Sequence, residues 1–247
     1  MRYPLGALAC GALLALPGVA PAMSLDFIDT RMTYVATPGL SSISRSGATD
    51  PGGTPAPAND GEQHPQARRG YSIEGGVFAG TRLCREQDAG LMAGLSLFDT
   101  VRGGTVSAAY NGVAKEDLDA FGVKMHLGAY LRLRQFRFEC LPFAAIGPSR
   151  GAAYATVPLA EQDSPESELL GTQVEVHSDI STFYDYGLQL GACYAPVEAG
   201  SFLVGAALGY EAFTSTVTFP QNATTGGATD RLSGHGLDLV ISAGGSF

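Results

Sequence analysis

The sequence predicts an all-β fold: a closed antiparallel up-and-down transmembrane β-barrel with eight strands. Three observations support this. First, beyond residue 70 apolar and polar residues alternate with a period of two, as in strands with two unlike faces. Second, the chain contains 33 Gly and no Trp, with 45% hydrophobic and only 16% charged residues, which suits closely packed strands in an apolar setting. Third, no apolar run beyond the N-terminus reaches the roughly 18 residues of a membrane-spanning helix, so only a closed barrel could cross a membrane.

The N-terminal part divides into two segments before the barrel. Residues 1–22 have the features of a secretory signal peptide, with Arg2 before an apolar stretch and Ala20-Pro21-Ala22 as a cleavage site. Residues 23–70 are rich in Pro, Gly and Ser, a composition that predicts a flexible segment, which we expect to lie in the periplasm. Residues 24–36 are strand-like within it, which leaves open whether they add a strand to the predicted barrel at 71–247.

Eight strand-like segments follow, each bounded by turn signals. They span approximately 71–84, 90–98, 105–113, 121–134, 136 onward, 183–195, 201–217 and 233–247. Polar or long connections follow the odd segments and shorter ones follow most of the even segments. This alternation predicts short turns at one end of the barrel and long loops at the other.

The first segments are predicted from their alternation and from the turns between them. The first places Tyr71 and Ile73 on the face opposite Glu74. The second ends at a predicted tight turn, Val101-Arg102-Gly103-Gly104, and the third ends at the charged residues 115–119. Glycine pairs and charge clusters are common turn signals.

The middle segments show both the clearest and the weakest strand patterns. The fourth places seven apolar residues on one face, from Phe121 to Leu133. The fifth starts almost at once, so the turn at Gln135 must be tight, but Pro142 and Pro148 cannot donate to a ladder and predict a bulge. A loop rich in Asp and Glu follows.

The last three segments alternate regularly, and the eighth carries the strongest signal. Leu237, Leu239 and Ile241 lie on one face, Asp238 lies on the other, and the sequence ends at Phe247. Here the sequence resembles the small bacterial outer-membrane β-barrel proteins of the OmpA and OmpX type, whose closing strand alternates in this way and ends in Phe. The resemblance implies the cell outer membrane of a Gram-negative-type bacterium as the location. It also implies Phe247 as an insertion signal for the barrel-assembly machinery, and outer-membrane lipid and lipopolysaccharide as partners.

A water-soluble barrel with an apolar interior is the structural alternative. The second face of the strands argues against it, because its charged residues are few and are interspersed with Gly, Ala and Ser. Such a face suits a lumen better than a surface in water. We therefore expect apolar side chains to face lipid and charged ones to face inward.

The predicted lumen holds acids and bases in near balance. Because buried charges must be paired, we expect a salt-bridged network that fills the bore. Its predicted members are Glu74, Arg82, Lys124, Arg132, Arg134, Arg137, Glu139, Asp185, Glu211 and Asp238. The predicted function is a structural or surface-interaction barrel with mobile extracellular loops, and the extracellular partner is left unidentified. A narrow channel for ions or small solutes is the first alternative.

A lipid-modifying barrel enzyme is the second alternative, but we expect no enzymatic activity. His177-Ser178-Asp179 and Ser233-Gly234-His235 lie near strand ends predicted to face outward, yet neither matches a known motif of such enzymes. No His or Cys pair has metal-ligand spacing and no phosphate-binding glycine loop is present, so no metal or cofactor is predicted. The net charge of −9 argues against nucleic acid as a partner.

Three cysteines remain after the predicted signal peptide, so at least one is unpaired within the chain. Cys140 and Cys193 fall near the same rim on neighbouring strands, whereas Cys84 falls at the other. The alternation places Cys140 and Cys193 on opposite faces, which argues against a bridge, and their pairing is left open.

Overall fold

The computed structural model describes residues 25–49, 55, 61–83, 88–110, 113–157, 172–196, 201–220 and 227–247. Its strands are β1 (Leu25–Ala36), β2 (Ser42–Ser46), β3 (Gly61–Gln63), β4 (Ala67–Arg82), β5 (Ala89–Tyr110), β6 (Val113–Leu133), β7 (Phe136–Val157), β8 (Thr172–His177), β9 (Ser181–Tyr194), β10 (Ser201–Thr218) and β11 (Thr229–Ser246). In the described ranges, no helix is long and apolar enough to span a membrane. The predicted signal peptide, Cys84 and most of the acidic loop lie outside these ranges.

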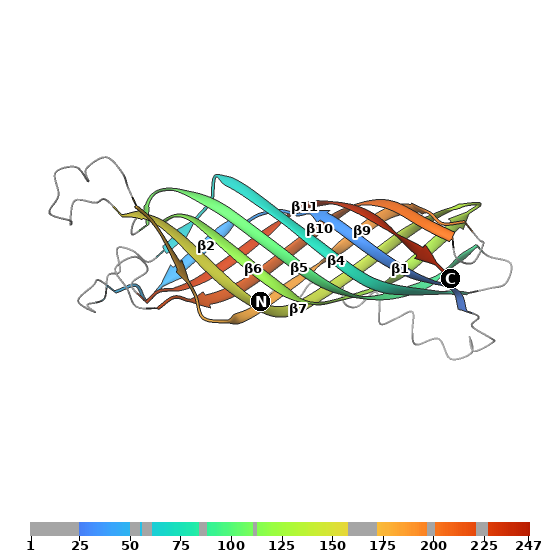
Figure 1. Cartoon of the computed structure of the whole chain (residues 1–247), viewed down its shortest axis with the longest axis horizontal. Coiled ribbons are helices and arrows are strands. Elements are labelled where there is room, and N and C mark those ends of the chain that lie inside the picture. The colour runs from blue at the N-terminus through green and yellow to red at the C-terminus, as the bar shows by residue number, and fades with distance from the viewer. Residues whose placement is uncertain are drawn as a thin grey trace.

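Eight of the strands form a closed antiparallel ring in the order β1-β4-β5-β6-β7-β9-β10-β11, and β1 pairs with β11 to complete it. Figure 1 shows the strands running obliquely around the long axis of an elongated barrel. The prediction of an all-β closed barrel with eight strands in its wall is therefore confirmed. The charged residues 115–119, expected to form a loop, lie within β6, and the strands differ from the predicted ones in two larger respects.

The first difference is that the segment expected to be flexible begins with a wall strand. β1 pairs with β4 from Leu25 to Ala36 and with β11 from Asp29 to Ala36, so the barrel starts well before residue 71. Asp29 and Arg31 face inward and Met32 faces outward, the same alternation as in the other strands. The Pro-rich composition of residues 37–65 outweighed this short pattern in the sequence.

The second difference is that the second and third predicted strands are one continuous strand, β5, without a turn at residues 101–104. The glycines there allow close packing rather than a reversal of the chain. A Cβ at Gly103 would collide with the Asp117 carboxylate, and one at Gly104 would press on Pro65. One strand gained and one lost leave the predicted count of eight unchanged.

The same two differences change which end of the barrel some connections occupy. Leu25, the β4–β5 connection and the β6–β7 turn lie at the end that holds Phe247, which we call the C-terminal end. The connections β5–β6, β7–β9 and β10–β11 lie at the opposite end, which we call the far end. The connection after Arg82, predicted to lie with the long loops, is therefore at the C-terminal end.

Residues 37–46, directly after β1, pack into the far end. The amide of Thr37 donates to Gly70 of β4, that of Leu40 to Gly103 of β5, and that of Ser41 to Ser233 of β11. β2 then pairs with β11, and β3 with β2. Leu40 is fully buried, in an apolar cluster that lines the interior there. This cluster comprises Leu40, Ile43, Phe98, Leu118, Ala120, Ala145, Ala153, Val176, Phe183, Phe213, Val217, Phe219 and Leu232.

Two prolines interrupt the ladder between β6 and β7 without ending β7. The register omits the positions where Phe121 would face Pro148 and where Leu127 would face Pro142. Proline has no N–H, so at each position the ladder offers no donor to the carbonyl opposite. β7 stays paired with β9 through both prolines. The β6–β7 register is the same on both sides of each proline, so the predicted bulge is not found there and the weakening is confined to one seam.

Candidate functional site: the charged lumen

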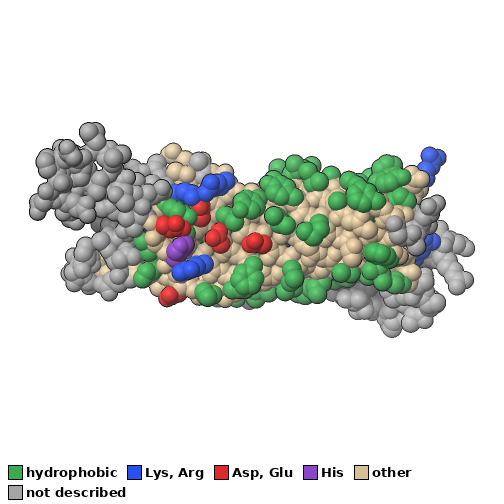
Figure 2. Space-filling model, in the orientation of Figure 1, with side chains coloured by type: hydrophobic (Ala, Val, Ile, Leu, Met, Phe, Trp, Pro, Cys, Tyr) green, Lys and Arg blue, Asp and Glu red, His purple; other side chains and the backbone are tan. Residues whose placement is uncertain are grey.

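The two faces of the barrel wall differ sharply in polarity. Along β6 the outward side chains from Phe121 to Leu133 are apolar and exposed, while Lys124 and His126 face inward and are buried. The other wall strands follow the same pattern, and together they form a band of exposed apolar side chains around the barrel, here called the apolar belt. Figure 2 shows these side chains over the middle and right of the barrel, with charged side chains gathered toward the far end.

A first ionic network crosses the bore between β1 and β7, which stand opposite each other in the ring of eight. Arg31 holds Glu139 through two hydrogen bonds of 2.7 Å and Asp29 through one of 2.9 Å. Arg137 donates through Nε to Glu139 at 2.8 Å and also bonds Asp29. All four side chains are at most 8% exposed, so these charges are shielded from bulk solvent and compensate one another.

A second network crosses the bore toward the far end, between β5 and β10, which are also opposite in the ring. Arg102 of β5 bonds Glu211 of β10 and lies 3.7 Å from Asp185 of β9. Its guanidinium also donates to the carbonyl of Pro38 at 3.1 Å and lies over the ring of Phe213. This arginine was missed in the sequence because the predicted turn at 101–104 removed it from a strand.

Nearer pairs join strands around the same part of the bore. Lys124 of β6 bonds Glu74 of β4, and both side chains are at most 4% exposed. Asp238 of β11 accepts a bond of 3.4 Å from Gln189 of β9. Three of the predicted acids thus pair with two cations, and the fourth, Asp238, is held by an amide.

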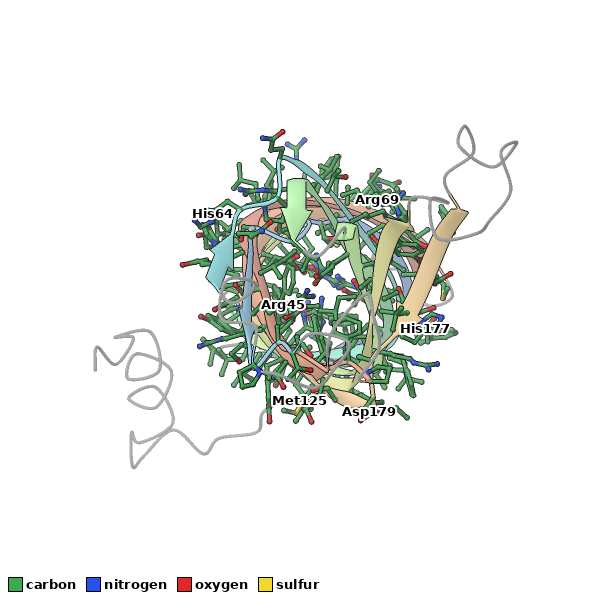
Figure 3. All side chains as sticks on the ribbon, turned by 90° about the vertical axis from the view of Figure 1, so that its left-hand side faces the viewer. Arg45, His64, Arg69, Met125, His177 and Asp179 are labelled. Carbon is green, nitrogen blue, oxygen red and sulfur yellow. The ribbon has the colours of Figure 1, made fainter. Side chains whose placement is uncertain are left out.

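A third network lies beyond the apolar cluster, at the far end. Arg45 of β2 donates to Asp230 of β11 through Nε at 2.8 Å and to Glu116 of β6 at 3.3 Å. β6 and β11 are opposite strands of the ring, and Figure 3 shows Arg45 inside the barrel. No sequence pattern indicated this network, because Arg45 lies in the segment expected to be flexible.

Nine of the ten predicted lumen residues take part in these contacts or lie at the C-terminal mouth of the bore. At that mouth Arg82 lies 2.7 Å and Arg132 lies 3.8 Å from Asp26, which also accepts a hydrogen bond from Tyr130. The tenth, Arg134, was placed wrongly. It sits in the β6–β7 turn with φ of 59° and is exposed, because the alternation of β6 stops where the chain reverses.

A small cavity of about 40 Å³ remains inside the barrel, next to the first network. His126 lines it, is 4% exposed, and has no hydrogen-bond partner on either ring nitrogen among the described residues. Arg31, Glu74 and Glu139 also line this cavity. It has room for a few water molecules, which polar walls of this kind hold.

Within the described ranges, neither His177 nor His235 is hydrogen-bonded to the serine of its own tripeptide. His177 lies 3.4 Å from Glu175, and the hydroxyl of Ser178 donates to the Asp179 carbonyl. His235 lies 3.5 Å from the hydroxyl of Ser41, which also donates to Ser233. Nor does the described part of the chain contain three or more His, Cys, Asp or Glu placed to hold a metal ion.

The two described cysteines are separate thiols. Cys140 is exposed on the outer wall, whereas Cys193 is buried and lines the internal cavity. The opposite faces indicated by the alternation are those observed. The Sγ of Cys193 lies 3.4 Å from Glu139.

No protein family matches the chain, and no curated protein matches it. It is similar to the solved structure of Ail, the attachment invasion locus protein of Yersinia pestis, at 11% identity over 91% of this chain and 100% of that one, with a TM-score of 0.28. It is also similar to the outer membrane protease OmpT from Escherichia coli, at 11% identity over 92% and 98%, with a TM-score of 0.40. It is similar as well to Neisserial surface protein A, at 12% identity over 87% of this chain and 96% of that one, with a TM-score of 0.26.

Proposed function

We propose that the chain is a structural barrel of a bacterial outer membrane, with a bore closed by ion pairs and far-end loops that contact extracellular partners. The observation that carries this is the reversed polarity of the wall. Met125, Leu127 and Leu131 are 60%, 50% and 45% exposed, while Lys124 and Arg137 are almost completely buried. Large exposed apolar surfaces are unfavourable in water and favourable against lipid.

The closed bore supports a structural role over the channel alternative. Three ionic networks join opposite strands, and the apolar cluster fills the interior between the second and the third. A diffusion pathway through this barrel would require breaking buried ion pairs, which is costly. The proposal assigns no catalytic step to the chain.

The proposed orientation places the C-terminal end in the periplasm and the far end outside the cell. The short β6–β7 turn and Phe247 lie at the C-terminal end, whereas the far end carries β2, β3 and β8 beyond the eight-strand wall. Short periplasmic turns and longer extracellular loops are the usual arrangement in such barrels. Lipopolysaccharide and outer-membrane lipid would then surround the apolar belt.

Electrophoresis of unheated and boiled outer-membrane fractions tests the proposal. We expect the unheated protein to keep its closed barrel in detergent and to migrate differently from the boiled protein, because every wall strand is paired on both sides. Recovery of the protein in the soluble periplasmic fraction, with no shift on boiling, would refute the proposal.

Replacement of the last residue tests the proposed role of the closing strand in assembly. Phe247 is 67% exposed, and its backbone exchanges hydrogen bonds of 2.8 and 3.2 Å with Ile28. We expect Phe247→Ala to reduce the heat-shifted barrel in the outer membrane several-fold, because the assembly machinery would lose its aromatic signal. Phe202→Ala is the matched control, since Phe202 is 65% exposed near the same end. Equal assembly of the two variants would contradict the proposed signal.

A further inference from the structure

The plug segment, defined here as residues 37–46, is held at the far end by a short ladder. Within it β2 pairs with β11 over five positions and with β3 over three, whereas β1 pairs with β11 over eight. Its apolar side chains Leu40 and Ile43 are buried in the apolar cluster. Arg45 is its one charged side chain and is also buried. The balance of charge around Arg45 therefore affects how firmly the segment is held.

Arg45 joins the plug segment to both sides of the bore and serves two acids. It bonds Asp230 of β11, the strand with which β2 pairs, and Glu116 of β6, on the opposite side of the ring. All three side chains are at most 1% exposed. One guanidinium compensates one carboxylate, so two ionised acids would leave a net negative charge in a site closed to bulk water, which is costly. A proton on one of the acids removes this excess.

Glu116 is the acid that holds the proton. Burial raises the pKa of Glu116 well above its usual range, and the charge of Asp230 raises it further, against a smaller lowering by Arg45. The Oε2 atom of Glu116 has no hydrogen-bond partner in the described ranges, whereas both carboxylate oxygens of Asp230 accept from Arg45. A protonated Glu116 donates to Asp230, which completes the network.

The strands packed around Glu116 bring no further charge to it in the described part of the chain. Gly104 of β5 and Ala153 of β7 stand beside it in the register. Arg102, the inward base of β5, is held by Glu211 in the second network. The other charged or titratable side chains near this height lie on the outer face of the wall: Lys115, Asp117, Asp119, Arg150, Glu175, His177 and Arg231. Glu116 also lies on the far-end side of Phe121, beyond the apolar belt.

We propose that Glu116 is a proton-dependent switch that holds the plug segment in place. While Glu116 keeps its proton, Arg45 and Asp230 form a balanced pair and the segment stays packed against the apolar cluster. When Glu116 releases its proton to water, residues 42–46 move out and both carboxylates become hydrated. The first two networks stay in place, so the change uncovers the far-end cluster without opening a path through the bore. This goes beyond the proposed function, because it gives the far end a state that depends on pH.

Hydrogen–deuterium exchange of the β2 amides, followed by mass spectrometry of the full barrel in detergent, tests the switch. The pKa of Glu116 is raised only while the plug segment is in place, so the closed state binds more protons than the open one. Closure is thus most stable below the ordinary carboxyl pKa and is lost as pH rises toward the raised pKa. We expect the protection of residues 42–46, corrected for intrinsic exchange, to fall about tenfold per pH unit in this window, between about pH 5 and about pH 9. Protection of β9 should stay constant.

Substitutions identify the titrating group. Glu116→Gln cannot ionise, so β2 should keep the low-pH protection of the wild type at every pH. Asp230→Asn leaves Arg45 with Glu116 alone, and the pH dependence should disappear from this range as well. Glu62→Gln is the matched control, because Glu62 is an exposed acid of β3 that accepts a hydrogen bond from Ser42. It should keep the pH dependence of the wild type.

The outcomes separate this inference from the proposed function. Protection of β2 that does not change with pH in the wild type, or pH dependence that survives Glu116→Gln, overturns the switch. If Glu116→Gln forms no barrel, pH dependence that survives Asp230→Asn overturns it instead. Every protein is checked for the electrophoretic shift on boiling. A wild-type barrel that shifts but has pH-independent β2 protection overturns this inference alone, and loss of the shift in the wild type overturns the proposed function.

Discussion

Arg137→Met is expected to lower the free energy of unfolding by about 3–5 kcal/mol, because it leaves buried carboxylates without one of their two cations. Arg137 is completely buried and is bonded to Asp29 and Glu139, whose side chains are 0% and 8% exposed. Arg31 cannot fully compensate two acids by itself. Because the chain contains no Trp, unfolding in urea is best followed by circular dichroism or by the electrophoretic shift.

Arg134→Met is the control for this prediction, since Arg134 lies three positions earlier in the exposed turn. We expect it to change stability by no more than about 0.5 kcal/mol. Adding Asp29→Asn to Arg137→Met should recover part of the loss, because one unpaired charge is removed. Equal costs for Arg137→Met and Arg134→Met would show that the network across the bore does not hold the barrel together.

Met125→Arg is expected to cost about 2–4 kcal/mol when the barrel is folded in lipid vesicles, because it places a charge in the middle of the apolar belt. Met125 is 60% exposed and lies on the outer side of the wall in Figure 3. In a water-soluble barrel the same change would fall within about 0.5 kcal/mol, as for most surface positions.

Thr216→Arg is the matched control for Met125→Arg, because Thr216 faces outward on β10 beyond the apolar belt. Its cost should stay below about 1 kcal/mol. The difference between the two costs in unfolding free energy therefore shows whether lipid or water surrounds Met125, because any general cost of an added arginine is common to both variants. If both changes cost little, the belt does not face hydrocarbon.

The alternation of apolar and polar residues correctly predicted which side chains of the regular strands face outward and which face inward. Successive side chains of a strand point to opposite faces, so the apolar set shares one face of the wall and the charged set the other. Glu74, Lys124, Asp185, Glu211 and Asp238 all face inward as this pattern indicated. The ion pairs themselves could not be predicted. They join strands on opposite sides of the ring, and no local sequence pattern indicates which residues of those strands lie at the same height in the bore.

The failures have local causes. At Arg102 a pair of glycines looked like a turn, although Gly103 is small so that the Arg69–Asp117 ion pair can pass over it. In β1 the strand pattern covers only twelve residues next to a long Pro-rich segment. At Arg134 the alternation was carried one residue too far, into a left-handed turn.

The seam between β1 and β11 joins two strands that are separated in the sequence by all the other strands of the wall. Closing so long a loop costs conformational entropy, and contacts of this kind form late and slowly. Until then both edges of the growing sheet are open to pairing with other molecules. A newly made chain must therefore be shielded from aggregation until β1 and β11 pair.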